Sequence, residues 1–142
     1  MPQTQDNMAA ERAAGASAGA RLATEVAPRG RIVILNALPL NALPRSHIRL
    51  DVLPVNIVDL GHWMYRRLAE GFEIVHYIRH QATIQALRRE LGIPLPLEPN
   101  AGLYSYQPGD ILVVVTLRAP QRGQEQTQVR VEDLEIWIVT VL

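Results

Sequence analysis

Two nearly continuous apolar runs constrain the fold of this chain more than any other feature. Residues 31–36 (RIVILN) and residues 111–117 (ILVVVTL) are rich in β-branched side chains and are apolar at consecutive positions. A strand of this kind has to be covered on both faces, as in sheets that carry other layers on each side. We therefore expect a buried strand at residues 31–36 and a central strand at residues 111–117.

Two segments have the three- and four-residue spacing of amphipathic helices. The first covers residues 57–68, with Asn56 as a candidate N-cap and Gly71 as a candidate stop. The second covers residues 80–91 and ends at Gly92, shortly before two prolines. These spacings predict two main amphipathic helices.

The remaining apolar segments are short and predict further strands. Residues 47–53 alternate between polar and apolar side chains, and residues 72–78 are rich in β-forming residues. Residues 103–106 precede a Gln-Pro-Gly-Asp turn at residues 107–110, which predicts a hairpin with the following strand. Residues 135–142 predict a last strand that is apolar enough to be a candidate sheet edge for self-pairing.

This alternation of strands and helices predicts a single α/β (α+β) domain over residues 30–142, with a small mixed sheet of about five strands. Residues 1–29 are rich in Ala, Gly, Gln and Thr and have few large apolar side chains, so we expect a mobile N-terminal arm. The polar residues 119–130 predict a loop.

Composition excludes several classes of function. Positive and negative side chains are balanced at 14 each, so no overall positive field favours duplex nucleic acid or an anionic membrane. Every basic residue is an arginine, whose fork suits phosphate, although a GC-rich coding genome explains the lack of lysine equally well. The chain has no cysteine, no bilayer-spanning apolar run and no secretory signal, so we expect a cytoplasmic protein.

No motif predicts a metal or a cofactor. A nucleotide-binding glycine loop, a serine elbow and a helical two-histidine metal motif are all absent from the sequence. The histidines fall on three different predicted elements without the spacing of metal ligands; they are His47, His62, His76 and His80.

One histidine lies where a predicted strand gives way to a helix. His80 is at the start of the second helix, beside Arg79 and three residues before Thr83. Free amide groups and the helix dipole make such a terminus suitable for a phosphate, and a bound phosphate would favour protonation of the imidazole. His80 is therefore a candidate general acid. A histidine that only caps the helix would give the same pattern.

Polar side chains also follow the two apolar strands. Asn36 and Asn41 lie in the loop after the first strand, and Arg118 ends the central strand ahead of Gln121. Ligand sites of open α/β sheets gather beyond strand ends, and an arginine there can bind phosphate. The alternatives are that the asparagines satisfy the turn backbone and that Arg118 is a solvated strand terminus.

Taken in order, four short motifs resemble a known family. They are Asn-Ala at residues 36–37, His-Gln-Ala-Thr at residues 80–83, Leu-Gly-Ile at residues 91–93 and Gln-Pro-Gly-Asp at residues 107–110. The chain resembles the viral anti-CRISPR ring nucleases that act against type III systems, and their CRISPR-associated cellular relatives, over residues 31–142.

The resemblance implies a homodimer that encloses one cyclic oligoadenylate, cyclic tetra-adenylate, and cuts it without metal. It implies that a ribose 2′-hydroxyl attacks the adjacent phosphorus while His80 protonates the departing 5′ oxygen, leaving linear di-adenylates with a 2′,3′-cyclic phosphate. Arg118 matches the family's phosphate-stabilising arginine.

The resemblance also implies ligand contacts, which are expected for Asn36, Leu38, Asn41, Arg79, Ala82, Thr83 and Gln121. The sequence departs from the family at Arg79, where glycine is usual, and at Gln121, which offers an amide where the family has a carboxylate. Two other functions remain open. The resemblance also allows a protein that binds and sequesters the cyclic nucleotide without cutting it, and the last strand allows an interaction protein that uses residues 136–142 as a pairing edge.

Overall fold

A computed structural model describes residues 28–118 and 129–142 of the chain, so most of the expected N-terminal arm and loop 119–130 lie outside the described residues. Five strands form one mixed sheet, accompanied by two α-helices, and the predicted α+β fold class is confirmed. In chain order the elements are β1 (Arg31–Leu35), η1 (Leu40–Ala42), β2 (Leu50–Val55), α1 (Ile57–Ala69), β3 (Glu73–His76), α2 (Gln81–Leu91), β4 (Ile111–Leu117), η2 (Val131–Asp133) and β5 (Leu134–Val141).

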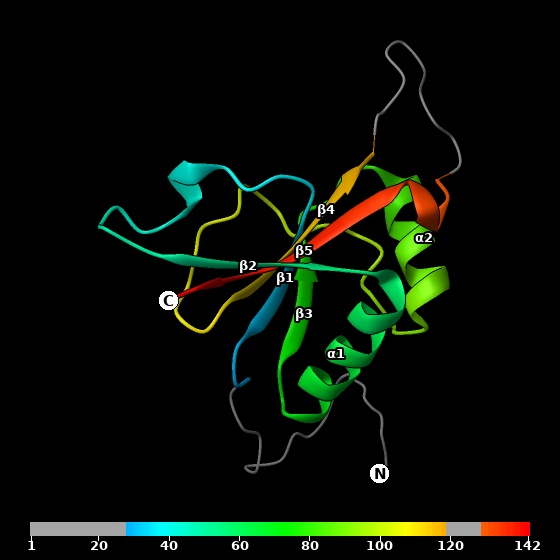
Figure 1. The fold of residues 1–142 in the computed structure, drawn as a ribbon, viewed down its shortest axis with the longest axis horizontal. Coiled ribbons are helices and arrows are strands. Elements are labelled where there is room, and N and C mark those ends of the chain that lie inside the picture. The colour runs from blue at the N-terminus through cyan, green and yellow to red at the C-terminus, as the bar shows by residue number, and fades with distance from the viewer. Residues whose placement is uncertain (1–27, 119–128) are drawn as a thin grey trace.

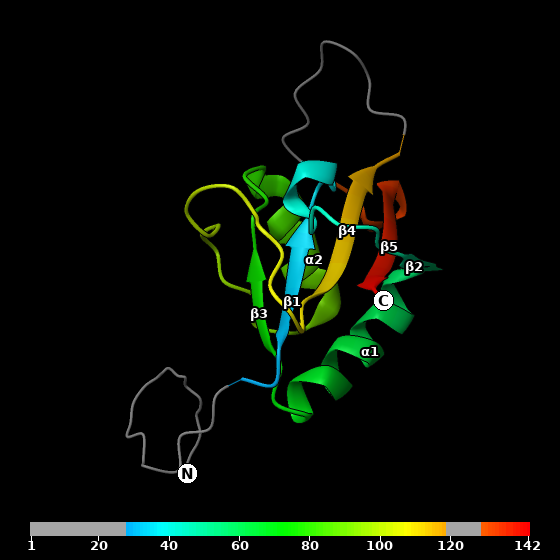
Figure 2. The same ribbon diagram turned by 90° about the vertical axis from the view of Figure 1, so that its left-hand side faces the viewer.

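The strand order in the sheet is β2-β5-β4-β1-β3. β1 pairs in parallel with both β3 and β4, whereas β5 pairs antiparallel with both β4 and β2. Figure 2 shows β3, β1 and β4 side by side with their arrowheads at the same end. The central position of β4 agrees with its apolar sequence, since Leu112, Val113, Val114 and Val115 are all buried.

Both helices pack on one face of the sheet, as Figure 1 shows. Leu60 and Met64 of α1 and Ile84 and Leu87 of α2 are completely buried there, which explains the helical spacing of the apolar residues. The opposite face is covered by the loops after β1 and before β4. The second core on that face includes Val33, Leu35, Leu43, Tyr104, Leu112 and Val139.

The helix ends follow the sequence signals. The Asn56 side-chain Oδ1 accepts a hydrogen bond from the backbone N–H of Asp59 at 2.8 Å, which caps α1. Gly92 ends α2 in the left-handed conformation, with φ of +65°, which costs glycine little. None of the described helices is long and apolar enough to cross a membrane.

Two predictions about strand pairing are wrong. Residues 103–106 form no strand, and β4 has β1 and β5 as its neighbours, so there is no hairpin; only the tight turn is present, with Asp110 N–H donating to Gln107 O at 3.0 Å. The last strand is not an edge, because β5 lies between β2 and β4. A function based on residues 136–142 as a free pairing edge is therefore excluded.

The edge strand next to β5 is β2, which begins and ends later than the predicted residues 47–53. Val52, which the alternation placed on the buried side, is 52% exposed. Pro54 within β2 lacks a backbone N–H, which is a feature that suits an edge position.

A buried ionic cluster joins β1 to the start of β4. The Asp110 carboxylate accepts from Arg31 Nε at 2.9 Å, from Arg31 Nη2 at 2.8 Å, from the Tyr104 hydroxyl at 2.7 Å and from Gln107 N–H at 3.0 Å. The hydrogen bonds to Asp110 raise the pKa of Arg31 above its ordinary value, although burial opposes this. Burial raises the pKa of Tyr104 far above the ordinary tyrosine value, and its hydrogen bond to Asp110 adds to the effect.

Candidate functional site

The candidate residues lie beyond the ends of three parallel strands. Asn36 follows β1, Arg118 follows β4, and His80 follows β3 by four residues at the start of α2. Because β1, β3 and β4 run in parallel, their carboxyl ends meet at one edge of the sheet, where open α/β sheets hold ligands. β1 lies between β3 and β4, so Asn36 takes the middle position, and neighbouring strands are spaced by roughly 5 Å.

His80 is the N-cap residue of α2, in an extended conformation and exposed to solvent. Its side chain does not cap the helix, since no backbone amide donates to it. Instead its Nδ1 is 2.8 Å from the Oγ1 of Thr83, which is 5% exposed. The other ring nitrogen, Nε2, has no hydrogen-bond partner among the described residues. The arrangement fixes one side of the imidazole and leaves the other side open to a ligand.

The neighbours of His80 differ in what they can contribute. Arg79 is exposed, and a guanidinium is a suitable group for binding phosphate. Ala82 is half-buried and packs against the core on the helix-bearing face of the sheet. Of the residues predicted around the start of α2, the structure brings His80 and Thr83 into contact, and Arg79 is the exposed residue directly before His80.

The loop after β1 supplies two exposed amides. Asn36 and Asn41 are both exposed, and neither side chain forms a hydrogen bond with another described residue, so they do not satisfy the turn backbone. Leu38 is half-buried and packs against the loop-side core. The two asparagine side chains are thus free to contact a ligand, and the predicted ligand contact of Leu38 stays a prediction.

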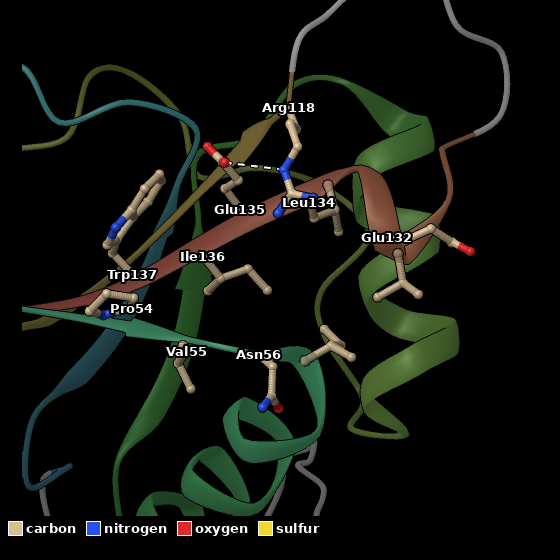
Figure 3. A pocket seen from close by; sticks show the side chains of 11 residues that line it. Pro54, Val55, Asn56, Arg118, Glu132, Leu134, Glu135, Ile136 and Trp137 are labelled. Carbon is tan, nitrogen blue, oxygen red and sulfur yellow. Dashed lines mark hydrogen bonds and ion pairs between the residues drawn. The ribbon is translucent and has the colours of Figure 1, made fainter.

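Arg118 points toward β5 and lies beside a carboxylate. Its Nε is 3.1 Å from Oε2 of Glu135, and its backbone N–H donates to Asp133 O. Figure 3 shows the two side chains meeting at the edge of a pocket between the end of β2, the start of α1, η2 and β5. The pocket has a volume of about 640 Å³. The lining residues are Pro54, Val55, Asn56, Ile57, Arg118, Val131, Glu132, Leu134, Glu135, Ile136 and Trp137.

This pocket does not contain all the residues of the predicted site. Neither His80 nor Asn36 lines it, and its charged lining residues in the described part of the chain are Arg118, Glu132 and Glu135. Gln121 lies outside the described residues, so its predicted contact has no structural account. The described residues bring His80, Thr83 and Asn36 to the same sheet edge as Arg118 without enclosing them in one cavity.

Sequence reasoning missed Glu135 as the partner of Arg118. The carboxylate comes from β5 because Glu135 pairs with Thr116, two residues before Arg118, in the antiparallel ladder of β4 and β5. A prediction of that pairing would have found it. Among the residues that the structure describes, no group of three or more His, Asp or Glu side chains could hold a metal ion.

Comparison with known proteins gives a similarity of fold. The structure is similar to B116 of Sulfolobus turreted icosahedral virus, with a TM-score of 0.59 and 17% sequence identity. The match covers 78% of this chain and 98% of B116. No protein-family model and no curated protein matches the chain. This chain therefore shares the fold of a viral protein.

Proposed function

We propose that this protein is a homodimeric, metal-independent ring nuclease that cleaves a cyclic oligoadenylate, of which cyclic tetra-adenylate is the expected substrate. The observation that carries the proposal is the imidazole of His80. It is exposed at a helix start, its Nδ1 contacts Thr83, and its Nε2 has no partner within residues 28–118 and 129–142. The fold shared with a viral protein and the motif resemblance support the same assignment.

The chemistry requires one proton donor close to a phosphate. Attack by a ribose 2′-hydroxyl forms the O2′–P bond and breaks the P–O5′ bond, and the hydroxyl proton passes to water. In the imidazolium form of His80, Nδ1–H donates to the Thr83 hydroxyl, and Nε2–H is available for the departing 5′ oxygen. The free amides at the start of α2 favour the phosphate and stabilise charge that develops on it.

Arg118 can support that charge after exchanging its partner. The side chains of Arg118 and Glu135 are 60% and 40% exposed, so their ion pair contributes at most about 1 kcal/mol. A phosphate that accepts two hydrogen bonds from the guanidinium competes well with such a pair. A homodimer suits the substrate, because two-fold symmetry matches a ring of repeated phosphates.

Incubation of the purified protein with cyclic tetra-adenylate in EDTA tests the proposal. We expect the wild-type protein to cut the ring and His80→Ala to be slower by about 10²–10⁴-fold, the usual contribution of a positioned acid. His62→Ala is the matched control, since His62 is an exposed histidine on α1 away from the strand ends, and it should cut at the wild-type rate.

An intact ring in both the wild-type and the His80→Ala reactions would overturn the nuclease function. Calorimetric titration then decides the alternative, a protein that binds and sequesters the cyclic nucleotide. Tight binding without turnover would support sequestration, and absence of binding would exclude both functions.

A further inference from the structure

A second histidine lies four residues before His80 and is completely buried. His76 is the last residue of β3 and has no exposed surface. Its Nε2 is 2.8 Å from the carbonyl oxygen of Pro96, and its Nδ1 is 3.2 Å from the backbone N–H of Ile78. Both ring nitrogens therefore have a partner within the fold.

These two partners determine the protonation of the ring. The Ile78 N–H can only donate, so Nδ1 of His76 has to be the acceptor and carries no proton. The Pro96 carbonyl can only accept, so Nε2 has to carry the proton and donate it. The arrangement requires the neutral Nε2–H tautomer, because a doubly protonated ring would leave the Ile78 N–H without an acceptor.

The Ile78 amide lies in the short connection that presents His80. Between the end of β3 and the start of α2, Tyr77 N–H donates to Ile34 O of β1 at 3.0 Å, and Ile78 N–H donates to His76. The first bond ties the connection to the sheet, and the second fixes the bend toward α2. Ile78 itself is completely buried, so this bend is packed as well as hydrogen-bonded.

The same residue also holds the loop that covers the free edge of β3. The backbone carbonyl of His76 accepts from Asn100 N–H at 2.7 Å, in addition to the side-chain contact with Pro96. β3 is an edge strand with β1 as its neighbour in the sheet, and the loop bonds to its last residue on the side away from β1. One side chain and its backbone thus connect the sheet edge, the loop and the start of α2.

We propose that His76 is a positioning residue for His80: its neutral ring fixes the Ile78 amide, and through it the place and direction of the His80 imidazole at the start of α2. The proposal rests on the proposed function for its kinetic consequence, but its geometric part holds for the folded protein without any substrate. His76 itself touches no ligand, since it is completely buried.

Two substitutions separate the two hydrogen bonds of the ring. The side-chain oxygen of asparagine takes approximately the position of Nδ1, so His76→Asn keeps an acceptor for Ile78 N–H. The side-chain nitrogen of glutamine takes approximately the position of Nε2, so His76→Gln keeps a donor for Pro96 O. We expect kcat to fall by up to about 100-fold in His76→Gln, as for a misplaced catalytic group, and by less than about threefold in His76→Asn. KM should change little in either variant.

Nuclear magnetic resonance of the imidazole nitrogens tests the geometric part without activity. In the wild-type protein, the ¹⁵N shifts of His76 should show a neutral Nε2–H ring, and a charged ring or an Nδ1–H ring would overturn the proposal. The resonances of His80 should move in His76→Gln and stay close to wild type in His76→Asn. Equal effects of the two variants on His80, or none, would also overturn it.

This design separates two kinds of failure. If the wild-type protein cuts no cyclic oligoadenylate, the proposed function fails while the resonances still decide the role of His76. If it cuts and both variants keep the wild-type kcat, with only their stability reduced, His76 is a structural residue and the inference is wrong.

Discussion

Neutralising the buried carboxylate of Asp110 should destabilise the protein far more than neutralising an exposed one. The Asp110 side chain is 1% exposed, accepts four hydrogen bonds and faces the Arg31 guanidinium, which is 16% exposed. In Asp110→Asn, the amide nitrogen meets donors, and the charge of Arg31 loses its counter-ion in a poorly solvated place. Breaking a buried pair in this way costs about 3–5 kcal/mol of unfolding free energy.

The matched comparison is Glu70→Gln. Glu70 pairs with Arg67 at 2.9 Å, close to the 2.8 Å of the buried pair, but its side chain is 40% exposed. Loss of such a surface pair changes the unfolding free energy by only about 0–1 kcal/mol. Urea denaturation of both variants at pH 7, followed by circular dichroism, measures the two losses. Equal losses would refute the reasoning that burial, and not the ion-pair distance, determines the cost.

Asp110→Asn should also leave the rate of ring cleavage per folded molecule unchanged. Asp110 binds the first residue of β1, whereas His80 follows the carboxyl end of β3 at the opposite edge of the sheet. The rate is measured without denaturant, at a temperature at which the variant is folded. A lower rate than that of the wild-type protein would show that the Asp110 cluster and the His80 site are coupled.

Two further predictions concern stability. Asn56→Ala should lower the unfolding free energy by about 1 kcal/mol, because the first turn of α1 loses its cap. Thermal denaturation should show this loss as a lower Tm. An unchanged Tm would mean that the cap contributes nothing to stability. Because the pKa of Tyr104 is raised in the folded protein, the unfolded chain loses the hydroxyl proton first as the pH rises above about 10. The contribution of Tyr104 to the unfolding free energy should therefore be constant below about pH 10. Above that pH the unfolding free energy should fall by up to about 1.4 kcal/mol per pH unit. Tyr104→Phe should remove this part of the pH dependence.

The helices and most strands could be predicted because their signals are local. The three- and four-residue spacing of apolar side chains, the Asn56 cap and the Gly92 stop act within a few residues, and the structure confirms both helices. The position of β5 could not be predicted in this way. Its apolar sequence fits an edge or an interior strand equally well, and the choice depends on pairing with β2, far away in the chain.

The candidate site also has residues that local patterns predict and residues that depend on distant parts of the chain. The positions of Asn36, His80 and Arg118 beyond strand ends follow from local patterns, and parallel pairing brings them to one edge. The Glu135 carboxylate beside Arg118 depends on the register of two strands. The role of His76 depends on Pro96, which reaches it through a loop, so a histidine in an apolar strand carried no signal of its own.

The interior position of β5 has a consequence for how the molecule is assembled. β2 has β5 as its single neighbour in the sheet, and during synthesis the ribosome makes α1, β3, α2 and β4 before β5. Until then, β2 has no strand to pair with, and its apolar side chains are exposed. The nascent chain has to keep β2 from pairing with other segments. Because β2 and β5 are far apart in the chain, their pairing is slow compared with the formation of a hairpin. Pro54 has no backbone N–H, which protects β2 from pairing with wrong partners before β5 is made.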